Sequence, residues 1–483
     1  MDTSADDNLS EEFAENRSSS ETHYSNQNHL TAPFAKMETE VYGSLAALGC
    51  LCFFIHRVAS RAQPTLQASN PDFLRFQRLF FIVYFPALFS DWLQGPYVYK
   101  LYSYYGFAES QIAVLYVVGF AASILFGTST GPLADRFGRK LMCVCFAVLY
   151  SICCFTKLSP EYFVLLFGRI LGGISTSMLF SSFEAWYVYE HREHHGFPVE
   201  WISSTFSKAT FYNGLLAIIA GIVANFAAET LSWGPVAPFM LSVPCLVVAG
   251  IGAGYYWPEN RGSVNPEPGL SCMKGLRYIL SDPTTLQLGM VQALFEAVMY
   301  IFVFLWTPML EPARPPLGLV FSCFMVAIMI GSSIYSICTS KLVKSEQVLL
   351  AACGLALCCT LVCAYSSGAP IISLGAFILL EVCVGMYYPA IGSLRSQVVP
   401  EQYRANIINW FRVPMNLITC GGLLWLHSGT ENNAETNRHM FLMCTVVLAG
   451  ATYVAYCFCQ RFKSTPTVAL VQEEPLLKSS EEP

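Results

Sequence analysis

Charged residues are scarce in this chain of 483 residues. They make up 12% of it, against about 25% in a typical soluble domain. The net charge is −6, from 27 Lys and Arg against 33 Asp and Glu, so the chain lacks the basic surplus of nucleic-acid-binding proteins. Apolar residues reach 54%, and the mean hydropathy is +0.46. This composition argues against a cytosolic enzyme or a disordered scaffold and indicates an integral membrane protein.

The sequence also has few of the residues that carry chemistry inside a membrane. All eight histidines lie in predicted tails, loops or helix ends, so the apolar segments lack the usual base for catalysis. No glycine–lysine string of the Walker type occurs, which argues against ATP as the driver. The 19 cysteines show no zinc-binding spacing. We therefore expect a protein that is not an enzyme and that holds no metal ion or cofactor.

Long apolar runs are abundant, and a run of about 20 residues can cross a bilayer as a helix. The twelve predicted spans are 76–98, 109–132, 141–157, 162–189, 203–228, 236–257, 284–308, 317–339, 347–366, 369–394, 404–427 and 438–460. The domains expected from them are a disordered acidic tail over 1–36, an extra helix over 37–57, a six-helix bundle over 73–257, a cytoplasmic linker over 258–283, a second six-helix bundle over 284–460 and a cytoplasmic tail over 461–483.

Lys and Arg are distributed unevenly between the two sets of loops. If residue 73 lies on the cytoplasmic side, 18 of the 27 basic residues, Arg395 among them, fall on that side and six on the other. Positive charge collects on the cytoplasmic side of membrane proteins, so this orientation is predicted. A spanning helix over 37–57 would then put the first tail outside, where Asn8 and Asn16 begin possible glycosylation sequons.

The segment after the second predicted span is the most specific motif in the chain. It reads Gly131-Pro-Leu-Ala-Asp135-Arg136-Phe-Gly138-Arg139-Lys140, and a weaker motif on the fourth span reads Gly168-Arg169-Ile-Leu-Gly172-Gly173. Both resemble signature motifs of the major facilitator superfamily. The resemblance implies an all-α membrane protein with twelve helices in two six-helix bundles, here with an extra N-terminal helix. The gating residues that we assign are Asp135, Arg136, Arg139, Lys140, Arg169 and Glu184.

Four further strings narrow the resemblance to the molybdate-anion transporter family. They are Asp91-Trp-Leu-Gln-Gly-Pro-Tyr97, Phe183-Glu184-Ala-Trp186-Tyr, Phe295-Glu296-Ala and Asn409-Trp410-Phe411-Arg412-Val-Pro414. The likeness covers residues 40–460 and implies molybdate, a tetrahedral oxyanion, as substrate. We expect a monomer in the plasma membrane, surrounded by lipid and without a nucleic-acid partner. An acidic-leucine string, Glu473–Leu477, is compatible with an endosomal pool.

Charged side chains inside the predicted spans fall on helices that line the central cavity in this superfamily. They are Asp91, Arg169, Glu184, Lys208, Glu296, Glu381 and Arg412. A charge within a bilayer is costly, and it marks a functional site by default. The pattern therefore predicts a site at the centre of the molecule.

Arg412 is the predicted centre of an anion site. Asn409 precedes it by three residues and Asn416 follows by four, on one helical face. A planar guanidinium with amide donors beside it suits an oxyanion. The remaining substrate-site residues that we assign are Lys208, Asn213 and Trp410. The alternatives are a structural ion pair of Arg412 with Glu296 or Glu381, and snorkelling of Lys208 to the cytoplasm.

Energetics predict that import of a dianion needs a coupling ion. Moving two negative charges into a cell at about 100 mV inside-negative costs about 4.6 kcal/mol. Asp91, Glu296 and Glu381 are the predicted proton carriers, because desolvated carboxyls can cycle between charged and neutral forms. Permanent helix-stabilising pairs are the alternative role for them. Two other functions stay open, namely transport of another solute such as a sugar or organic anion, and a receptor or scaffold on the same fold.

Overall fold

The structure is a computed structural model that describes residues 37–59, 70–198, 200–261, 268–366, 369–399, 404–427 and 433–464. Within these ranges the chain is helical and contains no strand. The tail over 1–36 with its two sequons, and residues 465–483 with the acidic-leucine string, lie outside the described residues.

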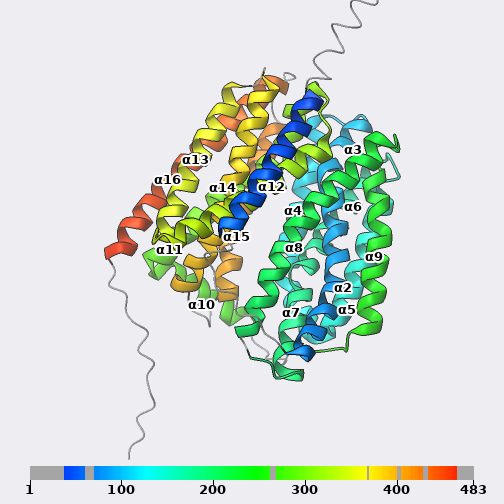
Figure 1. Cartoon of the computed structure of the whole chain (residues 1–483), viewed down its shortest axis with the longest axis vertical. Helices are drawn as coiled ribbons and strands as arrows, with labels where there is room; N and C mark the ends of the chain where they lie inside the picture. Colours follow the sequence, from blue (N-terminus) through cyan, green and yellow to red (C-terminus); the bar gives the residue numbers. More distant parts are fainter. Residues whose placement is uncertain are drawn as a thin grey trace, which may run out of the picture.

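The helices form two halves, and those of the first half precede those of the second along the chain (Figure 1). A helix over Met37–Ala59 comes first. The first half contains α2 (Pro71–Gln94) with η1 (Gly95–Tyr97) and α3 (Val98–Tyr104), α4 (Glu109–Phe137), α5 (Arg139–Thr156), α6 (Tyr162–Leu179) with α7 (Ser182–Tyr189) and η2 (Glu190–His194), α8 (Glu200–Asn225) with η3 (Phe226–Thr230), and α9 (Ala237–Tyr256). The second half contains α11 (Pro283–Leu310) with η4 (Glu311–Ala313), α12 (Leu317–Ser340), α13 (Ser345–Tyr365), α14 (Pro370–Val398), α15 (Arg404–His427) and α16 (Asn433–Ser464).

Helix packing in the second half repeats that of the first. The pairs α2–α8, α2–α9, α4–α6 and α5–α9 are matched by α11–α15, α11–α16, α12–α14 and α13–α16. Two further pairs, α8–α12 and α4–α15, join the halves. The predicted fold of two six-helix bundles is therefore confirmed, and twelve of the described helices, the first one included, are long and apolar enough to span a bilayer. The polar helix α15 is not among those twelve, although it packs as the eleventh helix of the bundles.

Small residues allow the closest helix contacts, and they too are repeated. A side chain on Gly173 of α6 would collide with the backbone of Gly119 on α4, and one on Gly385 of α14 would collide with the backbone of Ile328 on α12. Without a hydrophobic driving force between helices in lipid, association depends on such close backbone approach. The two halves therefore use the same packing solution at equivalent positions.

One prediction about the connections needs correction. The motif after the second span was expected to form a loop, but α4 continues through Phe137, and only Gly138, with φ of 117°, separates it from α5. A glycine tolerates this left-handed backbone, where other residues are strained. The segment 258–283, predicted as a cytoplasmic linker, contains the helix α10 (Pro268–Ser281), which packs against α15.

The first helix lies across the junction of α8 and α12. Near its start, the carbonyl of Val41 lies 3.9 Å from the Sγ of Cys323 on α12, and near its end the ring of His56 lies 5.2 Å, centre to centre, from the tilted ring of Phe211 on α8. Cys323 lies near the start of α12, whereas Phe211 lies in the first half of α8. In the predicted orientation these positions are outer and inner, respectively, so Met37 would lie at the outer end of the helix.

The two bundles are tied together at their outer end. Lys100 of α3 forms an ion pair of 2.5 Å with Glu311 of η4, and the ring of Phe304 on α11 contacts Tyr99 and Tyr116 of the first half. Figure 1 shows the helices of the two halves diverging toward the opposite end, where α7 and α10 lie. The two halves are therefore closed at the Lys100–Glu311 end, which is the outer side in the predicted orientation.

Substitution Glu311→Gln is expected to loosen this closure. A partly exposed ion pair contributes up to about 1 kcal/mol, and removing that amount shifts a two-state equilibrium about fivefold. Hydrogen–deuterium exchange in lipid nanodiscs should become up to about fivefold faster in peptides covering 98–105 and 311–316. Glu435→Gln, another exposed outer carboxyl, serves as the control. Equal exchange in both variants would show that the Lys100–Glu311 pair does not hold the bundles together.

Candidate substrate-binding site

Charged side chains of the second half interact between α11, α14 and α15, and Tyr388 links Glu381 to them. Glu296 interacts electrostatically with both Arg395 and Arg412, and Tyr388 interacts with Glu296, Glu381 and Arg395. Glu296 and Glu381 are 9% and 6% exposed. We call Glu296, Glu381, Arg395 and Arg412 the C-half charge cluster. It unites three of the predicted site residues with Arg395, which the sequence analysis placed among the cytoplasmic cations.

Helical spacing explains how α14 contributes to this cluster. Glu381, Tyr388 and Arg395 follow one another at intervals of seven residues, which is close to two helical turns and keeps them on one face. The same reasoning places Glu296 and Tyr300 of α11 together, since they are four residues apart. The predicted tenth span ended at residue 394, whereas α14 continues to Val398. Arg395 was missed for that reason, although its seven-residue spacing from Tyr388 was a usable signal.

Arg412 is held beside α11 by its neighbours on α15. Phe411 and Met415 are buried against α11, where Phe411 fills the space next to Gly289 and Met415 packs with Ala293. The Arg412 side chain is exposed, yet it interacts with Glu296 and Tyr300. It therefore lies beside interior groups of α11 while remaining accessible.

Direct ion pairing does not neutralise Arg412. Among the residues that the structure describes, no carboxylate lies within 4 Å of its guanidinium. Glu296 instead accepts a hydrogen bond of 3.1 Å from the hydroxyl of Tyr387, and the amide of Asn416 donates to the Arg412 carbonyl at 2.7 Å. Arg395 donates to Gln292 at 3.3 Å. The guanidinium of Arg412 is therefore available to a ligand.

The first half contributes Lys208 and Asn213 from α8. Lys208 donates to the side-chain oxygen of Gln77 at 2.9 Å, and Gln77 is buried on α2. Asn213 accepts a hydrogen bond of 2.8 Å from the indole of Trp92. This bond orients the side-chain amide of Asn213 because its oxygen accepts from Trp92. The amide N–H groups of Asn213 therefore remain available as donors. Lys208 is thus bonded within the bundle, in contrast to the snorkelling alternative.

Asp91 lies inside the first bundle, on the side of α5. Its carboxylate accepts a hydrogen bond of 2.5 Å from the hydroxyl of Tyr150. Tyr388 therefore interacts with both Glu296 and Glu381, whereas Asp91 is bonded to α5. Trp410 is also apart from the cluster, since it packs with Ile279 and Phe411 next to α10. The side chain of Asn409 lies outside the described part of the chain.

The predicted gating residues form contacts within the first bundle. Arg169 donates to the carbonyl of Leu115 at 3.1 Å and lies over the ring of Tyr116, which joins α6 to α4. The guanidinium of Arg139 lies 5.0 Å from the ring centre of Tyr189. Arg136 lies over Phe137, Lys140 donates its backbone N–H to Glu259, Glu184 is exposed on α7, and the Asp135 side chain is not described.

A clamp at the end of α9 was missed by the sequence analysis. Glu259 accepts the backbone N–H groups of Lys140 and Leu141 and so caps the start of α5. Trp257 stacks on Trp186 with ring centres 3.8 Å apart, and Asn260 donates to Glu190 at 2.9 Å. The motif around Gly138 therefore binds the end of its own bundle, and nothing in its spacing indicated this partner.

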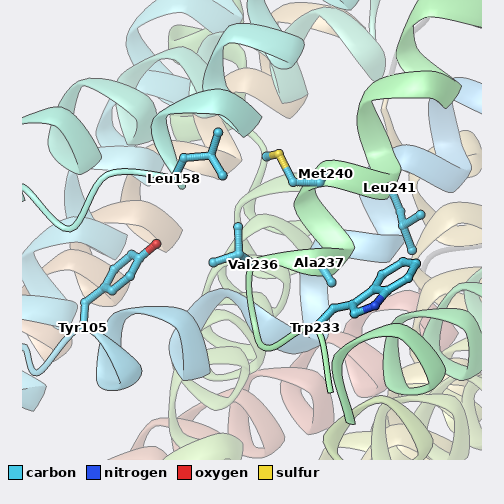
Figure 2. Close-up of a pocket in the computed structure, with 7 residues that line it drawn as sticks. All are labelled: Tyr105, Leu158, Trp233, Val236, Ala237, Met240 and Leu241. Carbon is cyan, nitrogen blue, oxygen red and sulfur yellow. The ribbon is translucent and has the colours of Figure 1, made fainter. Parts of the chain in front are cut away.

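A cavity of about 450 Å³ lies at the outer end of the first bundle, away from the C-half charge cluster (Figure 2). Its lining is mainly apolar and consists of Tyr105, Leu158, Trp233, Val236, Ala237, Met240 and Leu241. None of these residues carries a charge, and none was predicted to bind substrate. We therefore take the C-half charge cluster, with Lys208 and Asn213, as the candidate site.

Solved structures of transporters share the fold of this chain. A nucleoside transporter, NupG, matches with a TM-score of 0.63 at 12% identity, covering 79% of this chain and 99% of its own. A D-xylose-proton symporter matches with a TM-score of 0.63 at 13% identity, covering 78% and 97%. At this identity the likeness concerns the fold alone.

Relatives identified by sequence are much more similar to this chain than these solved structures are. Residues 37–386 match the family described as sugar transporters with 12 transmembrane segments. The molybdate-anion transporter of Takifugu rubripes is 43% identical over 451 residues, covering 86% of this chain and 94% of the relative. That of Xenopus tropicalis is 44% identical over 416 residues, covering 84% and 91%. The chain is therefore a multi-pass membrane transporter, not an enzyme, and it belongs to the molybdate-anion transporter family of the major facilitator superfamily.

Proposed function

We propose that this protein imports molybdate across the plasma membrane as a secondary active transporter. Arg412 is the residue on which the proposed molybdate site depends most. The relatives are named molybdate-anion transporters. The observation that carries the proposal is an accessible guanidinium on α15 that no carboxylate of the described residues neutralises. A planar guanidinium offers several N–H donors to a tetrahedral oxyanion, and a charge left unpaired within a membrane protein marks a ligand site.

Both halves supply donors in this proposal. Arg412 and Asn416 act from α15 of the second half, while Lys208 and Asn213 act from α8 of the first. Helices α8 and α15 occupy equivalent places in the repeated packing, because α8 packs on α2 as α15 packs on α11. Rocking of one bundle against the other would then expose the same donors to each side of the membrane in turn.

The second part of the proposal is that molybdate transport is coupled to protons. The interaction of Glu296 with two cations supports this coupling. Glu296 interacts with both Arg395 and Arg412. An oxyanion that binds Arg412 competes for its positive charge, and a carboxylate deprived of a cation in a desolvated site favours its protonated form. Protons on Glu296 and Glu381 would carry two positive charges, which balance a dianion and remove the cost of about 4.6 kcal/mol set by the membrane potential.

A sugar or another neutral solute is the second candidate substrate. The family description of residues 37–386 names sugar transporters, and one structural neighbour is a D-xylose-proton symporter. Neutral sugars are recognised by hydrogen bonds and aromatic surfaces without a need for unpaired cations. The charges of the C-half cluster therefore favour an anion.

Substitution Arg412→Ala is expected to reduce molybdate uptake to background. A hydrogen bond to a charged group contributes about 1.5–3 kcal/mol, so affinity should fall at least about tenfold. Elemental analysis of cells that express the variant, with surface biotinylation to measure the amount of protein, tests this. Arg412→Lys, which keeps the charge but loses the planar fork, should retain part of the uptake.

Arg438→Ala provides the matched control, since Arg438 is an exposed arginine over the ring of Tyr365 on another part of the chain. Molybdate, tungstate, sulfate, phosphate and xylose should be compared in the same cells. Normal molybdate uptake by Arg412→Ala at normal surface level would remove Arg412 from the site. Uptake of xylose alone by the wild-type protein would favour the sugar transporter.

Substitutions Glu296→Gln and Glu381→Gln test proton coupling. Glutamine resembles a permanently protonated carboxyl, so molybdate should still bind, but uptake should no longer rise as the external pH falls. Initial rates between about pH 5.5 and 7.5, together with intracellular acidification on addition of molybdate, measure this. Unchanged pH dependence in both variants would exclude these two carboxyls as proton carriers.

A further inference from the structure

A chain of hydrogen bonds connects Lys208 to the inner end of the first bundle. Lys208 contacts Gln77 at 2.9 Å, and Gln77 contacts the hydroxyl of Thr205 at 2.8 Å. Thr205 contacts the hydroxyl of Tyr187 at 2.5 Å, which lies 3.4 Å from the Nδ1 of His191. The chain ends where the Nε2 of His191 meets the carbonyl of Pro198 at 2.9 Å.

The donor and the acceptor of each hydrogen bond can be assigned by starting either from Lys208 or from the carbonyl of Pro198. An ammonium can only donate, so the oxygen of Gln77 must face Lys208 and its N–H group must face Thr205. The hydroxyl of Thr205 then donates to Tyr187, and Tyr187 donates to the Nδ1 of His191. At the other end, a carbonyl can only accept, so the Nε2 of His191 carries a hydrogen, and in a neutral imidazole the Nδ1 then accepts. Both ends thus require the same direction.

Burial makes this direction important. Thr205, Tyr187 and His191 have 0% exposure, and Gln77 has 4%. A buried polar group that loses its partner costs about 1–3 kcal/mol, so each member fixes the next. His191 also lies in η2, a π-helical turn, and such turns are often found at functional sites.

Lys208 is the one charged group in this chain of bonds, and its partner is neutral. Among the described residues, no carboxylate lies within 4 Å of its ammonium. An amide holds a cation in place without cancelling its charge, whereas a carboxylate at the same distance would form an ion pair with which a substrate anion must compete.

We propose that Gln77, Thr205, Tyr187 and His191 are positioning residues that hold the Lys208 ammonium in place, charged and unneutralised, as the anion contact of the first half. This inference rests on the proposed function, because it concerns how one oxyanion ligand is held. It adds four residues, none of them charged in this arrangement, to the machinery that determines anion affinity.

Substitution Gln77→Glu is the sharpest test, because it keeps the size and the acceptor oxygen but adds a negative charge next to Lys208. The KM for molybdate should rise at least about tenfold, while the maximal rate per surface transporter stays within about twofold. Gln94→Glu is the matched control, since Gln94 is a buried glutamine on the same helix that donates to the carbonyl of Ser90. Its KM should remain at the wild-type value.

A second pair of variants covers the case in which Gln77→Glu does not reach the surface. Thr205→Val interrupts the chain and should raise the KM about threefold, whereas Thr205→Ser keeps the hydroxyl and should leave the KM unchanged. Equal KM values for Thr205→Val and Thr205→Ser, or a wild-type KM for Gln77→Glu, would overturn the proposal.

The direction of the chain can be measured without any transport. Nitrogen-15 NMR of the protein with labelled histidine in nanodiscs should show His191 with hydrogen on Nε2 and an accepting Nδ1, and Tyr187→Phe should shift the Nδ1 signal. Hydrogen on Nδ1 would contradict the chain. Absence of molybdate uptake by the wild-type protein would instead contradict the proposed function, and molybdate uptake that depends on Arg412 but not on Gln77 would contradict only the present inference.

Discussion

The cost of placing charge inside a bilayer is the constraint on which the rest of this structure depends. A charged side chain within a membrane span must find water, a partner or a ligand. Here Glu296 interacts with Arg395 and Arg412, and Tyr388 interacts with Glu296, Glu381 and Arg395, on three helices of the second half. The carboxyls are nearly buried, while Arg412 is accessible and has no ion-pair partner among the described residues. The absence of such an ion pair is the observation on which the proposed ligand site rests.

The two halves share their packing but differ in how they hold a cation. Equivalent helix pairs and equivalent small-residue contacts, at Gly173 and Gly385, recur in both. Around α15 the cation is an arginine next to carboxyls, which allows competition between a substrate anion and a proton. Around α8 the cation is Lys208 bonded to a neutral amide, Gln77. The repeated scaffold thus carries different charge arrangements in its two halves, and the proposed division of proton coupling and anion binding rests on this difference.

Closure at the outer end complements this arrangement. The ion pair of Lys100 with Glu311 and the aromatic contacts of Phe304 connect the halves there. On the inner side of the first bundle, Glu259 and Asn260 bind the start of α5 and η2, so they stabilise a single bundle and do not join the two. The contacts of Glu259 and Asn260 thus lie within one bundle, whereas the bundles meet along the α8–α12 and α4–α15 pairs and at the Lys100–Glu311 ion pair.

The sequence by itself determined the membrane class, the helical fold and the helices that carry buried charge, because the length and polarity of a span are local properties that the bilayer selects. It also placed Arg412 and Asn416 on one face, since helical periodicity is local. Only the tertiary structure decided which charges meet. It joined Arg395 to Glu296, turned Asp91 toward Tyr150, and gave Glu259 to α5 and Gln77 to Lys208. Those pairings depend on how helices far apart in the chain pack together, and no spacing along one helix specifies its neighbour.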